Sequence, residues 1–188
     1  MRKVFYGGHL RPFKHVGDHP QFEHIRYPPS GYEFVDGRTP SVAVGRRVLA
    51  SIGELSWAAI KNGSTLPALA KFIRSRSVRA QVAVPLDVSL AFLPSMPFFL
   101  GQVPWVIEIE DTTTLFVPFP RIDGKRDDPR LFGTGGIYES GFLPVLKALL
   151  QSESCRGIIT HVKSTADSIP VLFDDPTLAD KVFHFPLG

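Results

Sequence analysis

The sequence predicts an α/β protein with a Rossmann-like, mostly parallel sheet and helices on both faces. The clearest observation is a strand–helix–strand pattern at the end of the chain, with strands at residues 157–162 and 181–185 around a helix at 164–173. This pattern is the repeating unit of a parallel sheet. A hydrophobic content of 44% is sufficient for a core, so we expect the 188 residues to form one domain.

The amino-terminal half contains short apolar segments separated by loops. Strands are predicted at residues 3–6, 22–27 and 80–84, and helices at residues 48–62 and 66–76. Apolar positions in the two helices recur at helical spacing. Residues 38–47 fit neither pattern, and residues 87–93 are predicted to form a short turn of helix.

The carboxyl-terminal half alternates more regularly. The segment PWVIEIE at residues 104–110 predicts a strand, and residues 141–152 predict a helix with one apolar stripe. A proline-broken loop from Thr112 to Gly136 lies between them. Long loops in compact domains are commonly functional or mobile, so we expect this loop to have such a role.

Composition excludes several classes of protein. The single Cys155 excludes an internal disulfide and fits a reducing compartment. Its place before a buried strand predicts an inert, packed thiol, with a nucleophile as the less favoured alternative. No apolar window is long enough for a transmembrane helix. The basic amino terminus is followed by no long apolar region, which excludes a signal peptide and predicts a cytoplasmic protein.

Charge is unevenly distributed along the chain. Residues 1–80 carry 13 Lys and Arg against 5 Asp and Glu, whereas residues 81–188 carry 8 against 13. The basic half predicts contact with phosphate groups or an anionic membrane surface, and an ordinary solvated surface is the alternative. Nucleic acid is not expected as a partner, because the sequence has no zinc-ligand spacing, helix-turn-helix pattern or RNP-type motif.

Gly7 and Gly8 follow the first predicted strand. Glycines at this position allow backbone amides to approach a phosphate closely, which predicts a phosphate contact. A plain tight turn is the alternative, because the sequence contains neither G-x-G-x-x-G nor G-x-x-x-x-G-K-[ST].

Three acidic residues stand at the end of the strand predicted at residues 104–110. The period of two puts Glu108 and Glu110 on one face. Two carboxylates on one face raise each other's pKa unless the face is wet or pairs with Arg or His, and burying them unpaired costs several kcal/mol. We therefore predict that this face borders a cleft, with Glu110 and Asp111 as catalytic candidates at the strand's carboxyl end. An edge strand or a structural ion pair is the alternative.

His161 lies near the carboxyl end of the strand at residues 157–162 and is the third catalytic candidate. A hydrogen-bonded core histidine is the alternative. Ser164, with Asp167 three residues later, predicts a helix N-cap, whose amides could also receive an anion. The six histidines lack a metal-ligand motif, so no metal site is predicted, and no serine stands in a G-x-S-x-G elbow.

The run GIITHVKSTADSIPVLFDDPTLADKVFHFPLG resembles the last strand–helix–strand segment of the amino-terminal domain in GT-B glycosyltransferases, especially those like family four. In that family a strand ends in a serine that opens a helix, and a K-V-x-x-x-P-x-G strand leads into a second domain. The matching residues are Ser164, Lys181, Val182, Pro186 and Gly188. Residues 104–111 resemble the family's central strand, which borders the acceptor side of the cleft.

The resemblance implies the acceptor-side half of an enzyme that transfers a sugar from a nucleotide-sugar donor to a hydroxyl of a carbohydrate or lipid-linked acceptor. It implies no cofactor and no required metal. Gly7, Gly8 and Ser164 would approach the donor phosphate, and Glu110, Asp111 and His161 would line the acceptor side. The family's carboxyl-terminal domain, which supplies most of the donor site, is absent from these residues, so we expect this domain to be inactive alone. A lipid-linked acceptor would agree with peripheral membrane contact by the basic half.

Two other functions fit the same residues. One is a non-catalytic module that binds a nucleotide or phosphate. The other is a small standalone α/β hydrolase that uses Glu110, Asp111 and His161. The hydrolase requires a nucleophile beside His161 in a closed pocket, whereas a glycosyltransferase half requires a parallel sheet with an open cleft at its carboxyl end.

Overall fold

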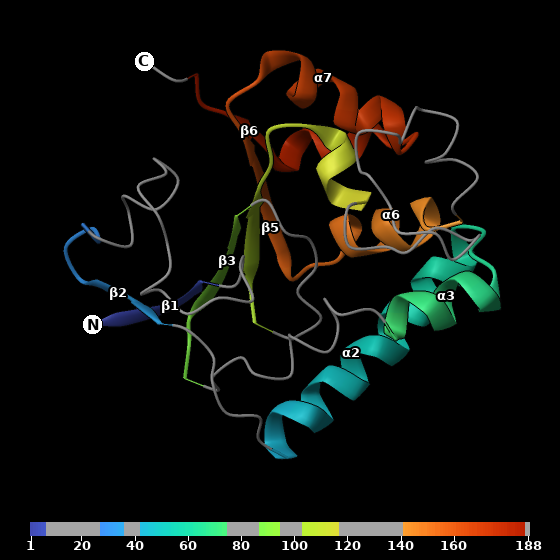
Figure 1. Ribbon diagram of the computed structural model, residues 1–188, viewed down its shortest axis with the longest axis horizontal. Helices are drawn as coiled ribbons and strands as arrows, with labels where there is room; N and C mark the ends of the chain where they lie inside the picture. Colours follow the sequence, from blue (N-terminus) through green and yellow to red (C-terminus); the bar gives the residue numbers. More distant parts are fainter. Residues whose placement is uncertain (7–26, 36–41, 75–86, 95–102, 117–140, 187–188) are drawn as a thin grey trace.

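The computed structural model describes residues 1–6, 27–35, 42–74, 87–94, 103–116 and 141–186. Within these ranges, six strands form an all-parallel sheet in the order β2-β1-β3-β4-β5-β6 (Figure 1). The strands are β1 (Arg2–Tyr6), β2 (Tyr32–Val35), β3 (Leu90–Pro94), β4 (Trp105–Glu108), β5 (Cys155–Thr160) and β6 (Val182–His184). The predicted Rossmann-like α/β fold with a parallel sheet is confirmed.

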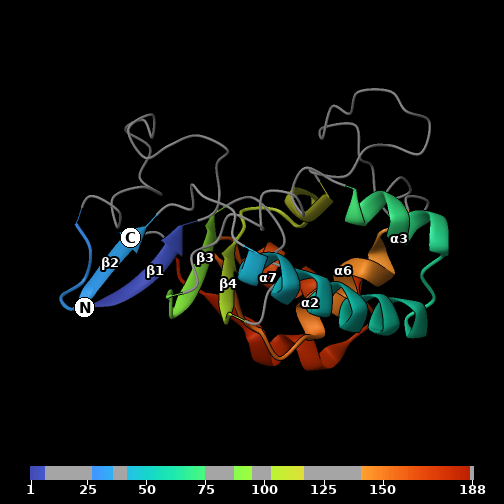
Figure 2. The same ribbon diagram turned by 90° about the horizontal axis from the view of Figure 1, so that it is seen from below.

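The strand order locates the region of the sheet where a ligand is expected. The chain runs from β1 outward to β2, returns past β1 to β3, and then continues in one direction to β6. The strand order therefore reverses between β1 and β3. In doubly wound sheets, ligands bind outside the carboxyl ends of the strands at such a switch point. Figure 2 shows β2, β1, β3 and β4 side by side in this order.

The described helices are α2 (Val42–Lys61), α3 (Leu66–Ile73), α6 (Leu143–Gln151) and α7 (Lys163–Leu172), with 3-10 helices η3 (Thr112–Phe116) and η5 (Pro176–Lys181). Local sequence explains their ends. Gly63 follows α2 with φ +91°, a conformation that glycine adopts without strain. The Thr65 side chain then accepts a hydrogen bond from the Ala68 amide and caps α3, and Pro67 lies in the first turn.

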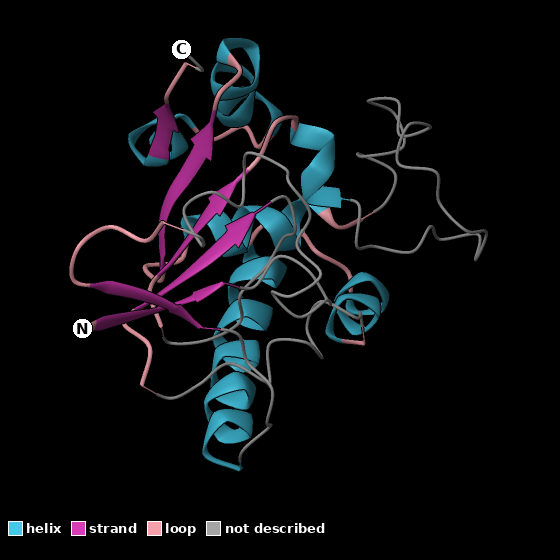
Figure 3. Cartoon of the chain, turned by 60° about the vertical axis from the view of Figure 1, so that its left-hand side comes forward, coloured by secondary structure: helices cyan, strands magenta, loops and turns pink. Residues whose placement is uncertain are grey.

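The hydrophobic core lies between one face of the sheet and these helices, and we call this face the helix face (Figure 3). Core side chains come from strands and helices alike: Phe5, Leu93, Trp105, Ile107 and Ile158 from the sheet, and Leu55, Phe72, Leu146 and Ile169 from α2, α3, α6 and α7. Because side chains alternate along a strand, the neighbouring residues Tyr6, Phe92, Val106 and Glu108 lie on the opposite face, which we call the second face.

The amino-terminal half differs from the sequence prediction at several elements. Helix α2 begins at Val42, so it includes part of the segment that fitted no pattern. The short helix predicted at residues 87–93 is wrong, because Leu90–Pro94 forms strand β3 between β1 and β4. Strand β2 was not predicted. The strand predicted at 80–84, and the one at 22–27 except for Tyr27, lie outside the described residues.

The carboxyl-terminal half follows the prediction more closely. Strands β4, β5 and β6 and helices α6 and α7 occur where expected, with ends shifted by one or two residues. The loop predicted from Thr112 begins with η3, and residues 117–136 of that loop lie outside the described residues.

The predicted Ser164 N-cap is wrong. Helix α7 begins at Lys163 after Val162, and no side chain caps it. Asp167, which the capping box required, forms an ion pair with Lys163 one helical turn earlier.

Candidate functional site

Four residues from different strands lie at the carboxyl edge of the sheet. Tyr6 ends β1, Glu108 ends β4, His161 follows β5 and Phe185 follows β6. Strand pairing brings β4, β5 and β6 together, and alternation puts Glu108 and His161 on the second face. The parallel sheet therefore collects at one edge several groups that are far apart in the sequence.

Glu108 and His161 form a direct pair. The His161 Nε2 lies 3.2 Å from Glu108 Oε1, and the His161 Nδ1 lies 2.6 Å from the Phe185 carbonyl oxygen. The Glu108 side chain is 8% exposed and the His161 side chain 24% exposed. The carboxylate is thus buried, whereas the imidazole reaches the surface.

These contacts fix the number of protons that the pair holds. A carbonyl oxygen can only accept, so Nδ1 of His161 carries a proton and donates it to Phe185. The contact between Nε2 and Oε1 then requires one further proton between them. The pair is either an imidazolium facing a carboxylate or a neutral imidazole facing a carboxylic acid. Both states have zero net charge, which reduces the cost of burying Glu108.

Tyr6 extends this polar group toward the switch point. Its ring stacks on Phe92 with centroids 5.8 Å apart and meets Phe34 edge-on. Burial, and secondarily the negative charge of Glu108, raise the pKa of Tyr6 well above its usual range. Tyr6 therefore stays a neutral phenol.

Glu110 and Asp111, the two predicted acidic site residues, are exposed beyond the end of β4. Asp111 Oδ1 accepts a hydrogen bond from the Thr113 amide at 2.7 Å and so caps η3. The carbonyl of Glu110 accepts from Thr165 Oγ1 at 2.7 Å, which joins the end of β4 to α7. His161 forms its hydrogen bonds with Glu108 and Phe185 and not with Glu110 or Asp111.

Glu108 is not among the predicted site residues, although pairing with an Arg or His was one of the environments expected for the acidic face. The structure supplies His161 as that partner. The pairing follows from the strand register, because Glu108 pairs with Ile159 and His161 is two residues further along the same face. The residue at the strand tip was preferred over the residue inside the strand.

The predicted phosphate contacts have different outcomes. Gly7 and Gly8 lie outside the described residues. Ser164 is exposed in the first turn of α7. The amide of Val162, just before that helix, donates to Thr160 Oγ1 at 3.2 Å, so the turn from β5 into α7 is closed by its own side chain.

Three exposed apolar side chains belong to the segments that end β5 and β6. Val162, Phe183 and Phe185 are 40%, 45% and 54% exposed. Phe183 lies over Gly157, where a Cβ atom would come within 3.0 Å of the Phe183 ring. The absence of a Cβ atom at Gly157 therefore permits this close approach of the Phe183 ring.

The described part of the chain contains no group of three or more His, Cys, Asp or Glu side chains placed to hold a metal ion. Its helices are also too short or too polar to cross a membrane. A scan against protein-family models, a search of curated proteins and a search of solved structures each found no match.

The arrangement has one clear chemical capacity. A buried carboxylate backs a partly exposed imidazole, and the two share one proton at the carboxyl edge of a parallel sheet. Because both ring nitrogens of His161 have partners, such a pair can accept or return a proton if a substrate hydroxyl comes within hydrogen-bond reach of the Glu108 carboxylate.

Proposed function

We propose that this chain is the amino-terminal, acceptor-side domain of a two-domain GT-B glycosyltransferase. The observation that carries the proposal is the Glu108–His161 pair at the carboxyl edge of an all-parallel sheet, held to the strand by which the chain leaves that sheet. Open α/β sheets bind their ligands at this edge. The resemblance of residues 104–188 to the family supports the same assignment.

In this proposal the pair serves the acceptor. In the transfer, the bond between the anomeric carbon and the donor phosphate breaks, and a bond from that carbon to the acceptor oxygen forms. The nucleoside diphosphate leaves with the bonding electrons. The acceptor hydroxyl must lose its proton, and the Glu108 carboxylate, held by His161, is the group that we assign to receive its hydrogen bond, because both ring nitrogens of His161 already have partners. Glu110 is exposed beside it and is available to other acceptor hydroxyls.

The donor side remains with the second domain. Gly7, Gly8 and Ser164 are proposed to approach the donor phosphates, and the nucleotide-sugar acts as a substrate with no separate cofactor. Because this domain supplies only a minor part of the donor site, nucleotide-sugars alone should bind it weakly.

One observation disfavours the standalone hydrolase. A nucleophile beside His161 needs a free ring nitrogen as its base, but Nδ1 contacts Phe185 and Nε2 contacts Glu108. Cys155 does not replace it, because burial raises the pKa of its thiol to about 11.

The first test is the reading frame beyond the codon for Gly188. We expect it to continue into a second α/β domain with two glutamates on one helix, and a stop codon directly after Gly188 would contradict the proposal. Calorimetry on the present chain with UDP-glucose and GDP-mannose is the second test. Weak binding is expected, and tight stoichiometric binding would favour a nucleotide-binding module instead.

Variants of the longer protein then test the site. Glu108→Gln and His161→Gln should reduce kcat for sugar transfer by about a hundredfold, the lower range of losses for general-base groups. Lys163→Gln changes an exposed residue on α7 and is the matched control, expected to leave kcat unchanged. Unchanged transfer in both site variants would remove the assigned role.

A further inference from the structure

The solvent side of α2 is unusually apolar. Leu49, Trp57 and Ile60 are 69%, 64% and 43% exposed, and their spacing puts them on one side of the helix. The opposite side buries Leu55 and Ala59 in the core. A surface helix normally has a polar outer face, and a helix that is apolar all round is normally covered. The outer face of α2 is therefore a candidate docking surface.

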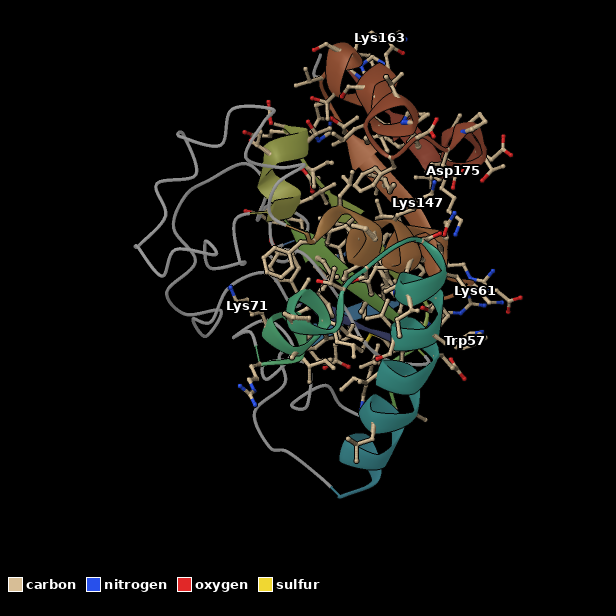
Figure 4. The ribbon with its side chains drawn as sticks, turned by 90° about the vertical axis from the view of Figure 1, so that its right-hand side faces the viewer. Trp57, Lys61, Lys71, Lys147, Lys163 and Asp175 are labelled. Carbon is tan, nitrogen blue, oxygen red and sulfur yellow. The ribbon has the colours of Figure 1, made fainter. Side chains whose placement is uncertain are left out.

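Charge indicates which partner fits. Lys61 Nζ lies 5.1 Å from the centre of the Trp57 ring, and Figure 4 shows both side chains on the outer side of α2. The sequence from residue 38 to residue 79 contains eight Lys and Arg and a single acidic residue, Glu54. Lys61 is the cation that the structure places beside Trp57, and together with the basic excess of this part of the sequence it favours a partner that accepts apolar side chains and carries negative charge.

We propose that α2 docks on an anionic lipid bilayer. Leu49, Trp57 and Ile60 enter the boundary between headgroups and acyl chains, and Lys61 extends to the lipid phosphates. Trp and Lys are the side chains typical of this zone, because each combines an apolar body with a polar end. The docking is independent of the proposed sugar transfer, although a lipid-linked acceptor would make use of it.

Other partners fit less well. A second copy of the chain would bring two strongly basic segments together, and their repulsion opposes association. A nucleic acid offers phosphates but no apolar layer for Leu49 and Ile60.

The test measures binding of the chain to vesicles of phosphatidylcholine with and without phosphatidylglycerol. Co-sedimentation should require the anionic lipid and weaken with added salt. Tryptophan emission gives a second readout, because Trp57 is exposed whereas Trp105 is fully buried. A blue shift on binding, and quenching by bromine-labelled acyl chains, should therefore come from Trp57.

Variants identify the surface. Lys61→Gln should weaken vesicle binding roughly fivefold, as expected for one cation near an anionic surface. The combined change of Leu49, Trp57 and Ile60 to Ser should weaken it at least about tenfold, because these apolar groups no longer enter the bilayer. Lys163→Gln and Val171→Ser are matched controls, because they change an exposed cation and an exposed apolar residue on α7. Circular dichroism checks that each variant is folded.

Three outcomes would overturn the proposal. The first is that the chain does not bind vesicles, or binds them whether or not they contain phosphatidylglycerol, and the second is that the α7 control variants lose as much vesicle binding as the α2 variants. The third is a dimer in solution that Trp57→Ser abolishes, without any vesicle binding, which would assign this face to a second copy of the chain. None of these measurements involves sugar transfer. Failure of the membrane-docking proposal would therefore leave the glycosyltransferase proposal unaffected, and failure of the glycosyltransferase proposal would leave membrane docking unaffected.

Discussion

The two ends of the β5–α7–β6 unit use polar side chains in different ways. At the amino end of these strands, Lys181 Nζ donates to the carbonyls of Leu150, Gln151 and Ser152 at 2.8, 3.1 and 2.9 Å. Leu150 and Gln151 end α6 and Ser152 is its C-cap, so these carbonyls accept no amide within the helix, although the Ser152 carbonyl also accepts from the Cys155 amide. At the carboxyl end, Glu108 and His161 chiefly satisfy each other.

The amino-end network also connects three helices. Asn62, just after α2, donates to Gln151 at 3.0 Å, and Gln151 donates to Asp175 at 2.7 Å. Asp175 then accepts from the amide and hydroxyl of Thr177 at the start of η5. Each of these side chains completes the hydrogen bonding of a helix end or of another member of the network.

The difference separates structural from functional polarity. The backbone at the amino end needs Lys181 and Asp175, because helix ends would otherwise lose partners. Among the described residues, no backbone group is bound by the Glu108 side chain, and well-packed apolar residues often replace a buried ion pair without loss of stability. A buried pair that the fold does not need is the better candidate for function. Three substitutions test this comparison, and a fourth, with the smallest expected effect, tests the packing of the strand beside the pair.

Lys181→Met should lower the free energy of unfolding by about 3 kcal/mol, because three carbonyl groups lose a charged donor. Urea denaturation measures the change. Lys147→Met is the matched control, since Lys147 donates to only one carbonyl, that of Asp174, and should cost less than half as much. Equal losses in both variants would remove the special role of Lys181.

Glu108→Leu should lower the free energy of unfolding by about 2 kcal/mol, because it leaves His161 without its buried partner. Adding His161→Leu should recover most of that loss, since both polar groups are then gone. A double-mutant cycle in urea measures the coupling. Losses that simply add would mean that the fold needs each side chain separately, which breaks the comparison.

Asp175→Asn should lower the free energy of unfolding at neutral pH by about 1 kcal/mol, because the side chain no longer accepts as an anion. Hydrogen bonding from the Thr177 hydroxyl, with contributions from Gln151 and Lys147, holds the pKa of Asp175 below its usual value of 3.8. A carboxyl group whose pKa is lower in the folded state than in the unfolded state stabilises the folded protein at pH values above its unfolded-state pKa. This stabilisation is lost as the pH falls through the folded-state pKa. The gap between wild type and variant should therefore close in acid, and a gap that stays constant would contradict the lowered pKa.

Gly157→Ala should have the smallest effect, a loss below about 1 kcal/mol. The new Cβ would lie 3.0 Å from the Phe183 ring, but that ring is half exposed and can move. Thermal unfolding measures the stability, and Gly141→Ala is the comparison. Gly141 has φ +69° and a Cβ there would lie 3.3 Å from Ala68, so its loss should be larger.

The sequence predicts the carboxyl-terminal half better than the amino-terminal half for a physical reason. Apolar periodicity defines α6, β5 and α7, whose buried residues are mostly aliphatic. Strand β3 was mistaken for helix because it is short, ends in Pro94 and pairs only with segments distant in sequence. Strand β2 was missed because it has only four residues, one of which is the charged Glu33. An alternation of period two cannot be recognised over so short a segment.

The candidate site shows the same limit. His161 was identified because it interrupts an apolar strand, and the acidic face of β4 was identified because charge is unusual there. The pairing of Glu108 with His161 depends on strand register, and the Phe185 carbonyl depends on where β6 ends. Neither can be read from one strand alone, because each is set by hydrogen bonding between strands.

The contact between His161 and Phe185 also has a mechanical consequence. The same imidazole that shares a proton with Glu108 is anchored to the backbone just after β6, and the Phe185 amide is bound in turn by Thr160. Bending of the polypeptide at that point would rotate the ring away from its carboxylate. Movement of the backbone after β6 and the proton held between His161 and Glu108 are therefore coupled through the carbonyl oxygen of Phe185.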